Sequence, residues 1–153
     1  MIAAIDPGIT GAVCIHDEGR YTFFDMPTLT MRNGKKRVDG QALATILKGC
    51  THVAIEEVSA MPGQGVTSMF SFGYSAGVCA GVCGALGASV HMVSPRSWKA
   101  HHSGLIGSDK DFARTMAIQR YPELAEHLQR KKDIGRADAL WMCLWLQSQM
   151  KKD

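Results

Sequence analysis

The N-terminal stretch IAAIDPGITG, residues 2–11, decides how the chain begins to fold. Its apolar residues predict a short buried strand at 2–5, which Gly8 and Gly11 bring to an end. Asp6 follows the strand directly, and a carboxylate is costly at the end of a core strand unless it is paired or binds a metal ion. We therefore expect a strand that ends in a functional acid. The alternative is that Asp6 is an ordinary turn residue.

The following segments predict a sheet with helices on its faces. Residues 12–16 and 21–24 predict two more strands, joined by a turn at 17–19. Helices and strands then alternate: a helix from the N-cap Asp39 to Gly49, a strand at 52–58, a long helix that ends near Gly87 and a strand at 90–93. Three helices follow. They are a short helix that begins at Pro95, a helix at 108–120 with Ser108 as N-cap, and a final helix from about Arg136 to Met150. This order predicts an α/β fold with a five-stranded mixed sheet, three antiparallel N-terminal strands plus two parallel strands, flanked by helices.

Length and composition predict one domain over residues 1–153. Apolar residues make up 46% and charged residues 20% of the chain, as in ordinary globular proteins. We expect no membrane span, since the apolar run at 78–88 is too short, and no secretion signal at the N-terminus. Five cysteines without a CxxC pair indicate reduced thiols in the core of a protein from a reducing cytosol.

Basic residues concentrate in two predicted loops, although the formal net charge is only +3. One loop contains Arg32, Lys35, Lys36 and Arg37, and the other contains Arg130, Lys131 and Lys132. Two basic loops on one small domain are what the neutralisation of nucleic-acid phosphates requires. The alternative is that both loops only increase solubility.

The long predicted helix is rich in glycine, with Gly73, Gly77 and Gly81 at i, i+4 spacing and Gly84 after them. Each glycine lowers helix propensity by about 1 kcal/mol relative to alanine. A helix tolerates this when its small face lets another backbone approach. We expect that face to pack on the sheet or on another helix of the same chain; a dimer interface is the alternative.

Carboxylates also interrupt two later elements. Glu56 and Glu57 lie in the apolar strand at 52–58, and Asp138 lies in the first turn of the final helix. Side chains alternate along a strand, so only one of the two glutamates shares a face with Asp6. Three converging carboxylates would repel one another without cations, and oxygen-only ligands suit Mg²⁺ or Mn²⁺. The alternatives are an edge-strand charge and an acid that stabilises a helix N-terminus.

Three short motifs resemble those of the RuvC-type Holliday-junction resolvases. They are IDPG at 5–8 followed by Thr10-Gly11, AIEEV at 54–58, and ADAL at 137–140. The order of the predicted elements is similar to that family along nearly the whole chain. The resemblance implies an RNase H-like fold and a Mg²⁺-dependent crossover junction endodeoxyribonuclease, found in the cytoplasm of a bacterial cell or a phage-infected host.

The resemblance also assigns roles to individual residues. Asp6, Glu56 and Asp138 match the metal-binding carboxylates of the family, while Glu57 then points to the other face. Lys99 and Lys110 are spaced like two lysines near the family's active site, which implies that they contact DNA phosphate close to the cut. The alternative is that both lysines are exposed on helix surfaces.

One departure from the family affects the metal site. Resolvases of this type have a second Asp or a His three residues before the last Asp, and here that position is Gly135. Asp133 is the nearest substitute, and we expect it to be a fourth metal ligand if the chain bends at Gly135. The departure suggests a phage-type or otherwise divergent member.

A second departure affects base stacking. The family places an aromatic residue soon after the catalytic Glu, and here that position is Ser59. Phe70, Phe72 and Tyr74 come later. They are candidates to stack on bases at an opened junction, and packing in the core is the alternative.

The expected reaction is phosphodiester hydrolysis with two Mg²⁺ ions per active site, for which Mn²⁺ substitutes. The expected substrate is a four-way DNA junction, held at its phosphates by the two basic loops and cut by a homodimer. Three alternatives remain: a nuclease acting on forks, flaps or RNA; a junction-binding protein without catalysis; and an actin-like ATP-binding protein, which would need a second domain.

Overall fold

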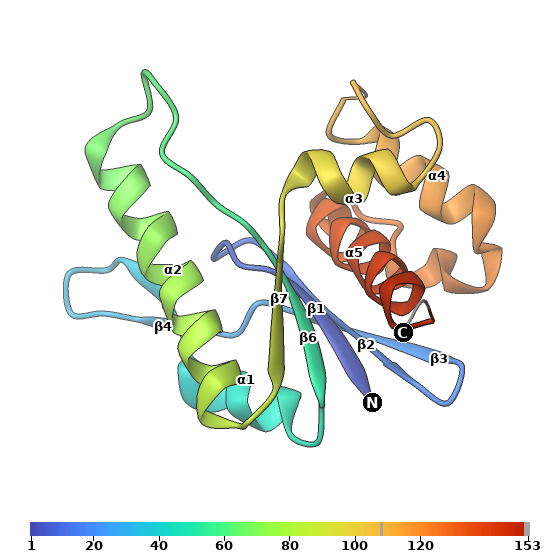
Figure 1. The fold of residues 1–153 in the computed structure, drawn as a ribbon. Coiled ribbons are helices and arrows are strands. Elements are labelled where there is room, and N and C mark those ends of the chain that lie inside the picture. Colours follow the sequence, from blue (N-terminus) through green and yellow to red (C-terminus); the bar gives the residue numbers. More distant parts are fainter. Residues whose placement is uncertain (108, 152–153) are drawn as a thin grey trace.

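A five-stranded mixed sheet forms the centre of the structure (Figure 1). Its strands are β1 (Ile2–Asp6), β2 (Ala12–Asp17), β3 (Arg20–Asp25), β6 (His52–Glu56) and β7 (Ser89–Val93), in the order β3-β2-β1-β6-β7. β2 pairs antiparallel with β1 and β3, whereas β6 lies parallel to both β1 and β7. The computed structural model describes residues 1–107 and 109–151, and there the predicted sheet is confirmed.

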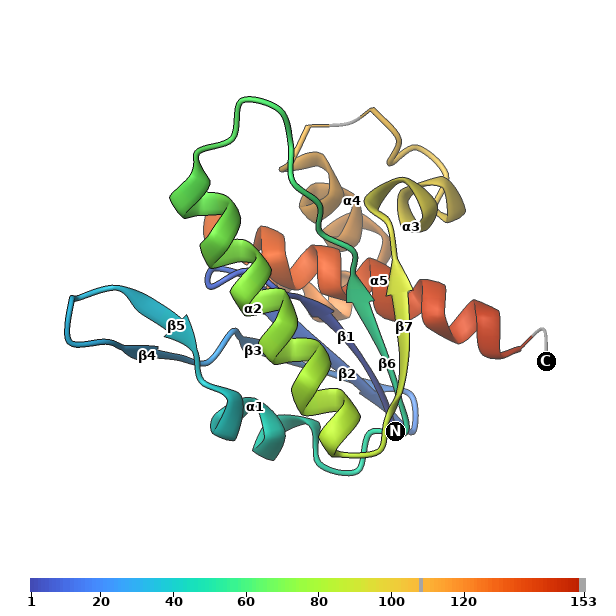
Figure 2. The same cartoon turned by 60° about the vertical axis from the view of Figure 1, so that its left-hand side comes forward.

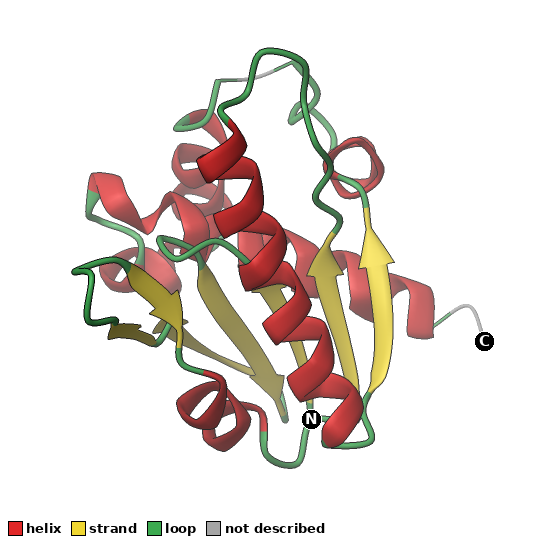
Figure 3. Ribbon diagram, turned by 90° about the vertical axis from the view of Figure 1, so that its left-hand side faces the viewer, coloured by secondary structure: helices red, strands yellow, loops and turns green. Residues whose placement is uncertain are grey.

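Helices cover both faces of this sheet (Figures 1 and 3). One face carries α1 (Gly40–Leu47) and α2 (Val66–Ala85); the other carries α5 (Ile134–Met150), with α3 (Pro95–His101), α4 (Phe112–Arg120) and the short 3₁₀ helices η1 (Pro122–His127) and η2 (Lys131–Asp133) beside it. Because side chains alternate along β1, Ala3 and Ile5 join the core under α1 and α2. Ile2 and Ala4 join the core under α5. Asp6, next in this alternation, therefore lies on the α5 face.

Polar side chains set the starts of several helices. Asp39 accepts a hydrogen bond from the Ala42 N–H (3.0 Å), which confirms this predicted cap. Ser94 accepts one from the Ser97 N–H (3.1 Å) and caps the short helix that begins at Pro95, as predicted. The helix predicted at 108–120 starts only at Phe112, and the Asp109 side chain before it accepts hydrogen bonds from the N–H groups of Asp111 and Phe112. The predicted cap Ser108 lies outside the described residues.

The first basic segment is a β-hairpin and not the predicted loop. β4 (Thr28–Thr30) pairs antiparallel with β5 (Lys36–Val38) in a separate two-stranded sheet. Gly34 has a positive φ of 79° in the connecting turn, a conformation that favours glycine. The hairpin stands out from the body of the protein beside the N-terminal half of α2 (Figure 2). The predicted strand at 52–58 is also shorter, since β6 ends at Glu56.

Helix α2 meets the sheet through Ser75, Cys79 and Cys83, all buried. Its glycines face away: a Cβ added at Gly73, Gly77, Gly81 or Gly84 would meet nothing within 4 Å. The expectation that these glycines pack within the chain is therefore wrong. We call the surface formed by these four glycines the outer face of α2.

By length and composition alone, α2 could also cross a membrane. The apolar segment is longer than the run at 78–88, since the helix begins at Val66, and the expectation that no segment spans a membrane stays a prediction. One helix of this kind is weak evidence for a membrane span. The prediction of reduced core thiols is confirmed in the structure, where all five cysteines are buried and free.

Candidate metal centre

Asp6 and Glu56 end two neighbouring parallel strands on the same face of the sheet. Ile5 pairs with Ile55, so Asp6 and Glu56 occupy the next position along β1 and β6. Parallel neighbouring strands lie about 5 Å apart, which places the two carboxylates side by side. Glu57 is exposed, and its backbone N–H continues the pairing with Val93. The prediction that only one of the two glutamates accompanies Asp6 is confirmed.

Asp138 completes a group of three partly buried carboxylates. It lies on α5 between the fully buried Ala137 and Ala139. The pKa of Asp138 is raised to about 8, mainly by burial and next by the negative charges of Asp6 and Glu56. The pKa of Asp6 is raised to about 7, mainly by burial and next by the negative charge of Glu56, although a hydrogen bond from the Gly8 backbone lowers it. The three acids therefore act on one another in a poorly solvated place.

Two glycines allow this convergence. A Cβ at Gly11 would overlap the carbonyl oxygen of Asp6. A Cβ at Gly135 would lie 3.1 Å from the Gly11 Cα and 3.2 Å from Oδ2 of Asp6. Helix α5 thus approaches the loop after β1 almost backbone to backbone. RuvC-type resolvases were expected to have an acid or a His at the position of Gly135. Here Gly135 lies against the Asp6 carboxylate and the Gly11 backbone, so the space that such a side chain would need is taken.

Trp98 is a residue of the site that the sequence did not reveal. Its indole Nε1–H donates a hydrogen bond to Oε2 of Glu56 (2.8 Å), and the side chain is fully buried. Burial raises the pKa of Glu56, while the hydrogen bond from Trp98 and the charge of Lys99 lower it. A tryptophan in a short polar helix was the available clue, since a buried indole N–H needs an acceptor.

Both predicted lysines lie near the acids. The positive charges of Lys99 and Lys110 lower the pKa of Asp138, against the larger effects of burial and of the other carboxylates. The ammonium group of Lys99 lies 5.3 Å from the centre of the Trp98 ring. These effects agree with the predicted position of the two lysines near the acids. Their contact with DNA phosphate stays a prediction.

The three carboxylates fit a divalent cation by their donor chemistry. Within residues 1–107 and 109–151, no three His, Cys, Asp or Glu side chains already form a ready-made metal cage. Asp6, Glu56 and Asp138 nevertheless supply only oxygen donors. Burial raises the pKa of all three, and repulsion between carboxylates raises the pKa of Asp6 and Asp138 further. Hard cations such as Mg²⁺ and Mn²⁺ take such ligands. The side chains would have to turn toward the ion.

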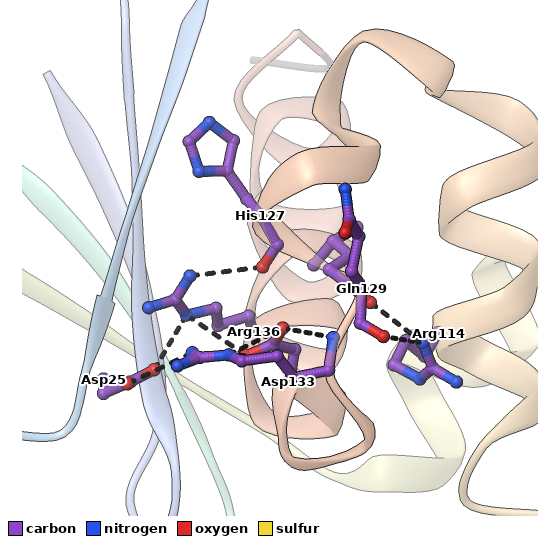
Figure 4. A network of polar contacts seen from close by, with 8 residues as sticks. Asp25, Arg114, His127, Gln129, Asp133 and Arg136 are labelled. Carbon is purple, nitrogen blue, oxygen red and sulfur yellow. Dashed lines mark hydrogen bonds and ion pairs between the residues drawn. The ribbon is translucent and has the colours of Figure 1, made fainter.

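Asp133 belongs to a different network, with arginines (Figure 4). Its carboxylate, 1% exposed, accepts hydrogen bonds from Nη2 (2.6 Å), Nε (2.9 Å) and the backbone N–H (2.8 Å) of Arg130. Arg136 lies 3.7 Å away and also pairs with Asp25 of β3. Burial opposes ionisation, yet these arginines lower the pKa of Asp133 overall. The structure places Asp133 among arginines, which gives no support to its predicted role as a fourth metal ligand.

The other predicted DNA contacts fall in three groups. Arg130 is occupied by Asp133 and Asp25, whereas the adjacent Lys131 and Lys132 are exposed on η2. On the hairpin, Arg32, Lys35 and Lys36 are exposed. The Arg37 guanidinium, in contrast, stacks on α2, 4.9 Å from the centre of the Tyr74 ring and 5.8 Å from that of Phe70.

Comparison with solved structures identifies the fold. The structure of Thermus thermophilus RuvC superposes with a TM-score of 0.55 at 16% identity, over 96% of each chain. T. thermophilus RuvC in complex with a Holliday junction substrate gives a TM-score of 0.54 at 14% identity, over 97% of this chain and 96% of that one. No family of sequences and no curated protein matches the sequence. The chain has a RuvC-type, RNase H-like fold, as predicted.

The buried acids make stability depend on pH. A carboxyl whose pKa is raised on folding stabilises the fold most below its unfolded pKa, and this stability is lost as pH rises through the folded pKa. Without metal, Asp138→Asn should therefore become progressively more stable than the wild type between pH 5.5 and 8.5, by on the order of 1–3 kcal/mol over this range. Urea unfolding in EDTA measures the difference; a difference that is constant with pH would contradict the account.

Asp133→Asn tests the second network. Removing one partner of a buried ion pair should destabilise the protein by about 2–4 kcal/mol at pH 7. The loss should be equal in EDTA and in Mn²⁺, because Asp133 pairs with arginines. If Mn²⁺ stabilises the wild type but no longer stabilises Asp133→Asn, then Asp133 is a metal ligand after all.

Proposed function

We propose that this protein is a structure-selective endodeoxyribonuclease that resolves four-way DNA junctions by Mg²⁺-dependent phosphodiester hydrolysis. The observation that carries the proposal is the gathering of the partly buried Asp6, Glu56 and Asp138, with raised pKa values, on a RuvC-type fold. A poorly solvated cluster of acids is unfavourable for folding, so a role in binding cations explains why it is there. The five buried free thiols are consistent with a cytoplasmic site of action.

Asp6, Glu56 and Asp138 would hold the cations, two Mg²⁺ per site or Mn²⁺ in their place. When bound, these cations supply Lewis-acid charge that activates water and stabilises the leaving oxygen. A water oxygen bonds to phosphorus, the P–O3′ bond breaks, and the 3′ oxygen takes up a proton, which leaves a 5′-phosphate and a 3′-hydroxyl. Trp98 holds one oxygen of Glu56 by its hydrogen bond, which leaves the other oxygen free to act as a ligand.

Lysines around the acids would hold the DNA. Lys99 and Lys110 supply positive charge on the side of Asp138 and would neutralise the phosphates next to the cut. The exposed Arg32, Lys35, Lys36, Lys131 and Lys132 would bind the phosphates of the junction arms. Contacts of this kind read the shape of the DNA and not its base sequence.

Symmetrical cutting of a junction needs two active sites, so we propose a homodimer formed through the outer face of α2. Its four glycines would let a second helix approach closely. Val66 is 79% exposed at the start of α2, and Val90 and Met92 on the edge strand β7 are also exposed. A second copy would cover this apolar surface.

The central test is the variant Asp6→Asn, compared with the wild type on a four-way junction, a fork, a flap and an RNA–DNA hybrid. We expect the wild type to nick the junction preferentially in Mg²⁺ and not in EDTA. Asp6→Asn should bind the junction yet cut at least about 100-fold more slowly, since each lost transition-state interaction costs several kcal/mol. Preferential cutting of another substrate would change the substrate class, and junction binding without cutting by the wild type would make the protein a binding protein only.

The dimer can be tested at Gly77. Because a Cβ there meets nothing within 4 Å, Gly77→Arg should leave the monomer folded but block the approach of a second copy. Sedimentation should show a dimer for the wild type and a monomer for Gly77→Arg, with unchanged circular dichroism. Gln41→Arg, at an exposed position of α1, is the matched control and should remain a dimer. A wild type that is monomeric at tens of micromolar would contradict this interface.

A further inference from the structure

Arg114 on α4 joins the segment before α4 to the segment that leads into α5. Its Nε and Nη2 atoms donate hydrogen bonds to Oδ1 and Oδ2 of Asp111 (2.7 and 3.1 Å). Its Nη1 atom donates to the carbonyl oxygens of Leu128 (2.9 Å) and Gln129 (3.2 Å), and Figure 4 shows Arg114 beside Gln129. The Arg114 side chain is only 15% exposed. One mostly buried guanidinium thus fixes two separate segments against each other.

The first of these segments contains Lys110. Oδ1 of Asp109 accepts hydrogen bonds from the backbone N–H groups of Asp111 (2.9 Å) and Phe112 (2.8 Å), and the Asp109 carbonyl oxygen accepts a further one from Phe112 (3.2 Å). Residues 109–112 therefore form a tight turn. Asp109 and Asp111 hold this turn on either side of Lys110, which is exposed. The charge of Lys110 lowers the pKa of Asp138, so the turn presents an exposed cation to the acid centre.

The second segment leads to the helix that contains Asp138. Leu128, which is fully buried, and Gln129 lie just before η2, and α5 follows η2 directly. Because Arg114 binds the backbone carbonyl groups of both residues, it sets the distance between this segment and the turn that contains Lys110. The position of Lys110 relative to α5 therefore depends on one side chain.

The guanidinium group of Arg114 is suited to this role. Three of its nitrogen atoms donate hydrogen bonds, to a carboxylate on one side and to two carbonyl groups on the other. A guanidinium can do this because its donors form a rigid planar fork, whereas the ammonium group of a lysine is a point charge on a flexible stem. A lysine at position 114 would keep the positive charge and lose the fork. Charge and geometry can therefore be separated at this position.

We infer that Arg114 is a positioning residue for the DNA phosphate next to the cut. It does not touch the phosphate itself. Through Asp111 it holds the turn so that Lys110 meets the phosphate at a fixed distance from Asp138, and its effect on DNA passes only through Lys110. The inference rests on the proposed function, which assigns this phosphate to Lys110.

The salt dependence of junction binding tests the inference without metal or catalysis. In EDTA, Lys110→Ala should reduce the slope of log Kd against log salt concentration by about 1, as expected for one lost phosphate contact. Arg114→Lys should reduce the slope by the same amount although it keeps the charge, because the turn is no longer held. Arg120→Lys, at an exposed position of the same helix, is the matched control and should keep the wild-type slope. A wild-type slope for Arg114→Lys would overturn the inference.

A variant at the other partner of the contact opposes positioning to simple electrostatics. Asp111→Asn removes a negative charge beside the DNA, which by itself should tighten junction binding. If Asp111 holds the turn, Asp111→Asn should instead bind with the reduced slope of Lys110→Ala. Because the Asp111 side chain is 42% exposed, this variant should fold even if Arg114→Lys does not. Tighter binding with an unreduced slope would contradict the inference.

A double-mutant cycle of nicking rates separates the inference from the proposed function. On a four-way junction in Mg²⁺, Arg114→Lys and Lys110→Ala should each lower kcat/KM by about 10- to 100-fold, and the double variant should cut no more slowly than Lys110→Ala alone. If the wild type cuts the junction but the two losses multiply, the inference is wrong and the proposed function stands. If the wild type binds the junction without cutting it, while Arg114→Lys still reduces the salt slope, the proposed function is wrong and the positioning of Lys110 by Arg114 stands.

Discussion

The close approach of α5 to the loop after β1 determines where the candidate site lies. A Cβ at Gly135 on α5 would lie 3.1 Å from the Gly11 Cα, and a Cβ at Gly11 would overlap the carbonyl oxygen of Asp6 in its own loop. This contact brings Asp138 over the face of the sheet on which Asp6 and Glu56 end their strands. Without it the carboxylates would sit on separate elements with no common chemistry.

The acids inside the protein have two different kinds of surroundings. Asp133 is surrounded by arginine side chains, and its pKa is lowered although it is buried. Among the residues that the structure describes, no arginine pairs with Asp6 or Asp138, and their pKa values rise to about 7 and 8. A poorly solvated acid without an arginine partner is where a cation from outside is most useful. This contrast distinguishes a structural acid from a candidate functional one.

Much of the fold could be predicted from the sequence, because strand alternation, glycine turns and N-caps are local. Asp39 caps its helix as expected, and Asp6 and Glu56 lie on one face because they end paired strands. The structure pairs Asp133 with Arg130 and Arg136, which lie three residues before and after it in the sequence, and its role as a metal ligand stays a prediction. Trp98 and the outward-facing glycines of α2 could not be predicted, because hydrogen-bond partners and helix orientation depend on the assembled fold.

The central claim is that Asp6, Glu56 and Asp138 form one site for divalent cations. Anomalous diffraction from crystals of the protein bound to a four-way junction and soaked with Mn²⁺ tests it most directly. The account predicts Mn²⁺ density in contact with all three carboxylates and with the DNA phosphate, and none at Asp133. Mn²⁺ density elsewhere in the protein, with these three carboxylates unliganded, would contradict it.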